Sequence, residues 1–175
     1  GVWSIMLAII SMSAVLGLSI NRSIVKFVAQ CKTSNEVKKY ITGSILISIL
    51  ASLIFWLFLY NVHEFVIEIY GMDREYSSVV KAILSNIAIL TMSVYTVSIL
   101  KGALTGLSEI AKANYLLIIG EIIRAFSAIF LLWLGFGLQS FFYGWIAGNL
   151  TLIVIYIYYL KKINGNILLF NFNLF

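Results

Sequence analysis

Five long apolar stretches, separated by short polar or glycine-containing segments, dominate the chain. They cover residues 1–20, 41–60, 79–100, 113–134 and 141–160. A stretch of about 20 apolar residues, folded as a helix, spans the roughly 30 Å hydrocarbon core of a bilayer. The pattern therefore predicts an all-α protein, a polytopic membrane helix bundle with five transmembrane helices in a single membrane domain, residues 1–175.

Polar residues and glycines indicate where these stretches end. Thr33 and Glu36 have the spacing of a capping box, which predicts that a helix begins there. Residues 101–112 are interpreted as a short turn. The uncharged run from 125 to 160 would be about 54 Å long as one helix, too long for a single crossing. The cluster Gly135, Gly137, Gln139 and Ser140 is the expected turn within it.

Residues 62–70 follow a different pattern from the five stretches. Their apolar positions recur at i, i+3, i+4 and i+7, while Glu64 and Glu68 occupy the other face. Gly71 follows as a stop signal. We expect a short amphipathic helix on the outer membrane surface.

Composition supports the membrane class. The chain is 62% hydrophobic and 11% charged, with a mean hydropathy of +1.02, whereas soluble domains contain about 25% charged residues. With one cysteine (Cys31) and one histidine (His63), an internal disulfide framework is excluded and no metal site is expected. We also expect no cofactor. The net charge of +5 does not indicate nucleic acid, because the basic residues gather on one side of the membrane.

The distribution of charge gives an orientation. Five crossings place the connections alternately on two sides. One side carries nine basic residues: Arg22, Lys26, Lys32, Lys38, Lys39, Lys101, Lys112, Lys161 and Lys162. The other carries two: Arg74 and Lys81. The positive-inside rule predicts that the basic side is cytoplasmic, so the N-terminus lies outside and the C-terminus inside. The start at Gly1, without an initiating Met, predicts a fragment of a longer membrane protein.

Two charges interrupt the fourth stretch. Glu121 and Arg124 lie one helical turn apart, with Arg124 about 16 Å along the helix and so near mid-membrane. A central arginine costs about 2.5–3.5 kcal/mol on insertion scales, so it usually faces a protein interior or a water-filled cavity. Asn86 and Asn149 are further polar groups within the stretches. These four residues are the candidate substrate-binding site, although the charged pair is also interpretable as purely structural.

Arg22 and Lys26 follow the first apolar stretch, on the polar face of its continuation. They are candidate basic residues at the cytoplasmic mouth, where an anionic headgroup would arrive. Binding of anionic lipid, or enforcement of topology, explains them equally well.

Three segments resemble a known family: GLSINRSIVKFVAQ, SILKGALTGLSEIAKANYLLIIGEIIRA and LLWLGFGLQSFFYGWIAGNL. They resemble helices two to six of polysaccharide flippases in the MATE-like superfamily. The resemblance implies export of lipid-linked oligosaccharide or polysaccharide precursors by alternating access. It also implies that Arg124 contacts the phosphate of the carrier lipid, with Glu121 holding or releasing it. The family's first helix and its second helical bundle have no counterpart in this chain and would form the remaining part of the transporter.

Other functions remain open. A drug or cation antiporter of the same superfamily would use Glu121 as its intramembrane acid. A non-transporting scaffold subunit would use the stripes of small residues along which helices pack closely. A membrane enzyme would need convergent acid, base or nucleophilic groups, which a lone histidine and a lone cysteine on opposite sides do not supply. Frequent Ile, Lys, Asn and Phe indicate an AT-rich microbial genome. The expected location is a bacterial or archaeal plasma membrane.

Overall fold

The structure, a computed structural model, describes residues 2–69 and 74–165 of the chain. Within these two ranges it consists of five helices and contains no β-strand. The helices are α1 (Val2–Gln30), α2 (Ser34–Ile69), α3 (Arg74–Gly106), α4 (Ile110–Trp133) and α5 (Gln139–Asn164). The predicted all-α class is confirmed.

Four helical segments are long and apolar enough to cross a membrane. They are Ser34–Asn61, Asn86–Gly106, Ile110–Trp133 and Gln139–Asn164. They contain all or most of the predicted stretches 41–60, 79–100, 113–134 and 141–160, in that order. This agreement supports a membrane-embedded helix bundle. The first stretch, 1–20, falls largely on residues whose side chains lie outside the described part of the structure, so that crossing stays a prediction.

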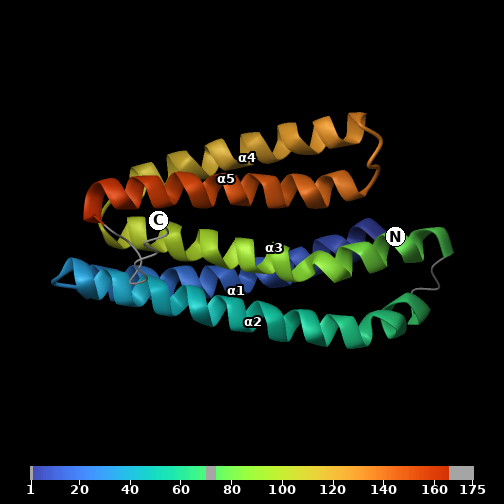
Figure 1. Cartoon of the computed structure of the whole chain (residues 1–175), viewed down its shortest axis with the longest axis horizontal. Coiled ribbons are helices and arrows are strands. Elements are labelled where there is room, and N and C mark those ends of the chain that lie inside the picture. Colours follow the sequence, from blue (N-terminus) through green and yellow to red (C-terminus); the bar gives the residue numbers. More distant parts are fainter. Residues whose placement is uncertain (1, 70–73, 166–175) are drawn as a thin grey trace, which may run out of the picture.

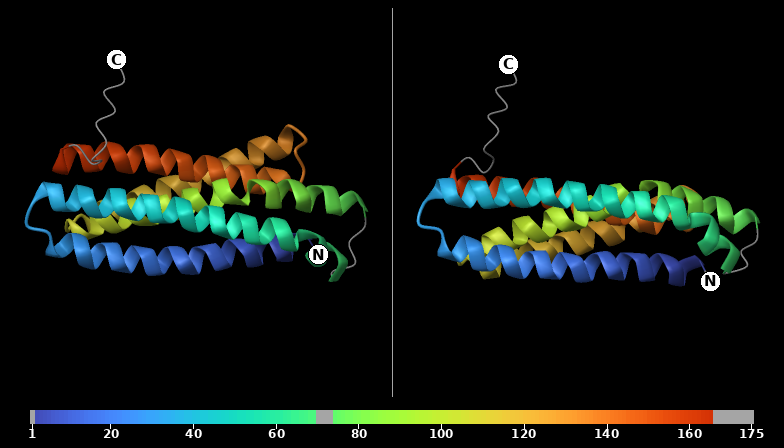
Figure 2. Two further views of the ribbon diagram at one scale, coloured as in Figure 1. Left: turned by 60° about the horizontal axis from the view of Figure 1, so that its bottom comes forward. Right: turned by 90° about the horizontal axis from the view of Figure 1, so that it is seen from below.

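The helices run side by side, with α3 in the middle (Figures 1 and 2). The helix α3 contacts each of the other four helices, and α4 and α5 form a closely packed hairpin. The turns from α1 to α2 and from α3 to α4 lie at one end of the bundle, and the turn from α4 to α5 lies at the other (Figure 1). The connections therefore alternate between two ends, as the sequence predicts.

The helix α3 is longer than its predicted crossing, 79–100. It continues to Gly106, and α4 begins at Ile110. The turn predicted at residues 101–112 is thus only residues 107–109, and this boundary was wrong. Gly102 and Gly106, which lie within this predicted turn, face α1 instead: a Cβ on Gly102 would lie 2.9 Å from the carbonyl oxygen of Asn21.

A Schellman motif makes this short turn possible. Ser108 has a left-handed backbone, with φ of +67°. The N–H of Ser108 donates to the carbonyl of Thr105, and the N–H of Glu109 to that of Leu104, each at 3.0 Å. These bonds supply donors to carbonyl groups that would otherwise be unpaired at the end of α3. The turn from α4 to α5 has a similar ending, since Gly135 has φ of +88° at the end of α4.

The segment 62–70 differs from its prediction as a separate helix. Residues 62–69 are the last turns of α2, because no proline or glycine occurs between 44 and 69 to interrupt the helix. Residue 70, Gly71 and the side chains of 62–69 lie outside the described part of the chain. The position of this segment on the outer membrane surface therefore stays a prediction.

Ser108 offers a test of the turn. Replacing Ser108 by glycine is expected to stabilise the protein by about 1 kcal/mol, because glycine adopts a positive φ without the steric cost that other residues meet. Thermal unfolding of the purified protein in detergent measures the effect. Ser108→Ala keeps the unfavourable backbone and should give no such gain. A melting temperature equal in all three proteins would contradict this account of the turn.

Candidate functional site

Arg124 faces the interface between α4 and α5. Its Nη1 donates to Oε2 of Glu121 at 2.8 Å, one turn earlier on α4. Its Nη2 donates to Oδ1 of Asn149 on α5 at 3.3 Å. The side chain of Arg124 is 19% exposed and that of Glu121 is 52% exposed. The guanidinium is therefore held inside the hairpin, while the carboxylate lies at its surface.

Two residues of α5 fit this position of Arg124. The guanidinium carbon lies 4.2 Å from the centroid of the Trp145 ring, a cation–π contact. Gly148 lets the helices approach, since a Cβ there would lie 2.9 Å from the Cβ of Arg124. The guanidinium thus rests against an aromatic ring, and the base of the Arg124 side chain packs on the backbone of α5 at Gly148.

The hydrogen bonds continue into α3. Asn149 Nδ2 donates to Ser93 Oγ at 3.0 Å, and Ser93 Oγ donates to the carbonyl of Leu90 at 2.7 Å. Asn149 and Ser93 are both buried. A polar network from Glu121 through Arg124, Asn149 and Ser93 therefore joins three helices. In a low-dielectric interior such a network fixes the helix faces that carry it, because leaving one member unpaired is costly.

One donor of Arg124 stays open. Its Nε is buried and has no hydrogen-bond partner among the residues that the structure describes. A buried donor without an acceptor is unfavourable, and guanidinium groups bind phosphate through two parallel N–H donors. An oxyanion would take this donor once Glu121 releases the guanidinium, because the carboxylate otherwise repels it. Chemically, the site is suited to an oxyanion that replaces Glu121.

The sequence candidates are brought together in part. Arg124, Glu121 and Asn149 form one network, with the predicted contact between the charged pair. Asn86 does not belong to it: it lies on α3 seven residues before Ser93, about 10 Å away along the axis. Sequence reasoning missed Trp145 as a site residue. Its position four residues before Asn149, on the same face of α5, was the available signal.

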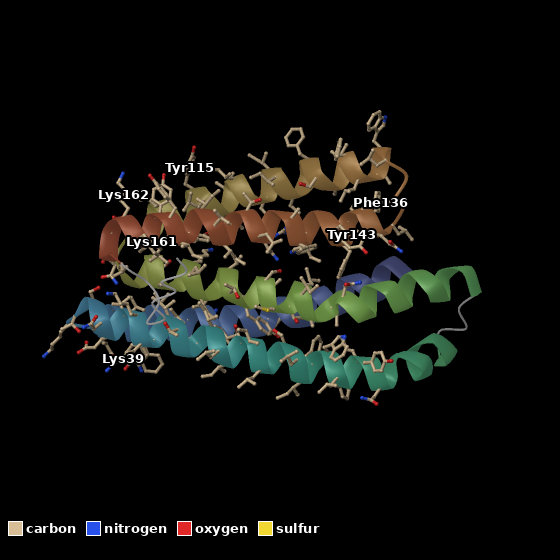
Figure 3. The ribbon with its side chains drawn as sticks, viewed as in Figure 1. Lys39, Tyr115, Phe136, Tyr143, Lys161 and Lys162 are labelled. Atoms are coloured by element: carbon tan, nitrogen blue, oxygen red, sulfur yellow. The ribbon has the colours of Figure 1, made fainter. Side chains whose placement is uncertain are left out.

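Arg22 and Lys26 lie elsewhere. Both are exposed on the last turns of α1. Neighbouring Asn21 fixes this part of α1 to α3, because its Nδ2 donates to the carbonyl of Ser98 at 3.0 Å. Lys39, Lys161 and Lys162 lie at the same end of the bundle, opposite the end with Phe136 and Tyr143 (Figure 3). These basic residues thus share one end, away from the Arg124 network.

Cys31 follows the last residue of α1. Its Sγ donates to the carbonyl of Phe27 at 3.3 Å. Burial, and secondly the negative charge of Glu36, raise the pKa of the thiol, so it stays protonated at neutral pH. Among the residues with described side chains, no three His, Cys, Asp or Glu gather as a metal site. The side chain of His63 lies outside the described part of the structure.

Comparison of the chain with protein-family models, with curated proteins and with solved structures finds no significant match.

Proposed function

We propose that this chain takes part in exporting lipid-linked oligosaccharide or polysaccharide precursors across a bacterial or archaeal plasma membrane. It acts as a transporter rather than an enzyme, by alternating access. Arg124 contacts the phosphate of the carrier lipid. The bilayer and the lipid-linked saccharide are its partners, together with the remaining half of the transporter, and the basic end faces the cytoplasm in keeping with the positive-inside rule.

The arrangement around Arg124 is the observation that carries the proposal. A mid-membrane cation is held by Glu121 and Asn149, rests on Trp145 and keeps its Nε without a partner among the described residues. Such a group is pre-positioned for a phosphate, and pre-positioning lowers the cost of ordering the site on binding. The exposed carboxylate of Glu121 holds the guanidinium when no substrate is bound. The sequence resemblance to polysaccharide flippases agrees with this assignment.

A drug or cation antiporter is the second candidate, because Glu121 is half-exposed and lies within a crossing helix. In that case Glu121 would bind the coupling cation, and Arg124 would have to release it first. A scaffold subunit would need neither group to meet a ligand.

Depletion of the gene product in its host tests the proposal. We expect lipid-linked saccharide to accumulate on the cytoplasmic side and to disappear from the outer leaflet, measured by a membrane-impermeant sugar label on intact and opened cells. Re-expression of the gene should restore outer-leaflet labelling. Unchanged labelling in depleted cells, with altered sensitivity to cations or drugs, would favour the antiporter and overturn the proposal.

A further inference from the structure

A groove runs between α2, α3 and α5, and shares only Ser93 with the Arg124 network. It has a volume of about 500 Å³. Its lining residues are Thr42, Ile45, Leu46, Ile49, Ile89, Met92, Ser93, Thr96, Leu150, Ile153 and Ile157. Leu46, Ile89 and Leu150 are about half exposed, so the groove is open along its rim. Its volume falls within the usual range for ligand sites.

The lining offers an occupant almost no hydrogen bond. Of the hydroxyl groups, Ser93 donates to Leu90 and Thr96 to Met92, both within α3. Every other named residue except Thr42 is apolar. Because the groove lies within helices apolar enough to cross a membrane, its surroundings are hydrocarbon. The part of a ligand that suits it is a flexible apolar chain.

Lysines continue the groove at one end. Lys38 precedes Thr42 by four residues on α2, and Lys161 follows Ile157 by four residues on α5. Each therefore lies on the groove face of its helix, about 6 Å beyond the last lining residue. Lys39 lies at the same end, three residues before Thr42 (Figure 3).

A direct contact brings the two lysine-bearing helix ends together. Ser34 Oγ, at the start of α2, donates to the carbonyl of Asn164, at the end of α5, at 2.8 Å. Lys38 and Lys161 are each about one turn from this contact. Glu36 faces differently, since it lies two residues from Lys38 and accepts the backbone N–H of Lys32 at 2.8 Å. The positive end of the α2 dipole meets the negative end of the α5 dipole here, so the lysines supply the positive potential.

We propose that the groove binds an anionic phospholipid of the surrounding bilayer. The acyl chain lies along α3 between α2 and α5, and the phosphate headgroup lies against Lys38, Lys39 and Lys161. Basic pockets between transmembrane helices are known to bind anionic headgroups. The apolar groove and the charged end match the two parts of one lipid molecule. This inference is independent of the transport function, because it uses neither Arg124 nor a saccharide.

The test is native mass spectrometry of the purified full chain in detergent, titrated with phosphatidylglycerol or with phosphatidylcholine of the same acyl chains. We expect the wild type to bind phosphatidylglycerol about tenfold more tightly. The double variant Lys38→Gln/Lys161→Gln should lose that preference. Lys101→Gln/Lys112→Gln removes the same charge at the same end, from α3 and α4 outside the groove, and should keep it. Equal losses in both double variants, or no loss in either, would overturn the headgroup assignment.

A second experiment locates the chain without any substitution. Phosphatidylglycerol with a photoactivatable diazirine on its acyl chain is added to the wild type, irradiated, and the labelled peptides are identified. Label is expected on residues 45–49, 89–96 and 150–157. Label spread evenly over the exposed face of α4, around Phe126 and Ile129, would show ordinary boundary lipid and overturn the groove assignment.

Discussion

Replacing Arg124 by alanine is expected to reduce export of the lipid-linked saccharide by about 10- to 100-fold. The change removes the cation that is proposed to bind the carrier phosphate, and charge-assisted hydrogen bonds contribute about 1.5–3 kcal/mol. The partners of Arg124 tolerate the loss differently. Glu121, which is half-exposed, loses its ion-pair partner, whereas buried Asn149 retains its bond to Ser93.

Arg124→Lys refines this prediction. Lysine keeps the charge but has no planar fork, so export should fall between the wild type and the alanine variant. Lys112→Ala is the matched control, because it removes a cation of α4 whose partner, Glu109, lies outside the network. The measurement is outer-leaflet saccharide per cell, with membrane abundance of each variant checked by immunoblot. Wild-type export by Arg124→Ala at wild-type abundance would contradict the phosphate role.

Replacing Gly148 by leucine is expected to destabilise the protein by about 3 kcal/mol, at the upper end of the usual cost of overpacking. A Cβ on Gly148 would lie 2.9 Å from the Cβ of Arg124 and 3.1 Å from the carbonyl oxygen of Gly120. The second contact is with backbone, which cannot rotate away. The helices α4 and α5 must therefore move apart, and Arg124 loses its contacts with α5.

Gly43→Leu is the control for this effect. Gly43 is also helical, but a Cβ there meets nothing within 4 Å. Leucine has a higher helix propensity than glycine by up to about 1 kcal/mol, so this variant should be as stable as the wild type or more stable. Thermal unfolding in detergent compares the two. Equal melting temperatures for both variants would show that α4 and α5 do not depend on the close approach at Gly148.

Glycines four residues apart, Gly102 with Gly106 and Gly144 with Gly148, predict close helix packing only in general terms. Gly102 and Gly106 pack on α1, whereas Gly144 packs on Ala128 of α4, with a notional Cβ 2.8 Å from the alanine Cβ. Nothing in the spacing assigns those partners. In a membrane, lipid-facing and helix-facing residues are both apolar, so the hydrophobic pattern does not distinguish one neighbour from another.

The helix ends show a similar division. The turn from α4 to α5 was predicted at Gly135–Ser140 and is observed between Trp133 and Gln139, because glycine there supplies a positive φ. The turn from α3 to α4 was predicted too long, because its left-handed residue is Ser108 and not one of the neighbouring glycines. Serine in that conformation gives little signal in sequence.

The sequence by itself determined the class of this protein, its apolar stretches, its basic end and the contact of Glu121 with Arg124. These follow from hydropathy, charge and the 3.6-residue helical period, which act locally along the chain. Only the tertiary structure decided that Arg124 meets Asn149, 25 residues away, and that Asn149 meets Ser93, 56 residues away. It also formed the groove whose face Lys38 and Lys161 extend. Such contacts depend on which helix faces pack together, and that choice is made by side-chain shape and hydrogen bonding across helices.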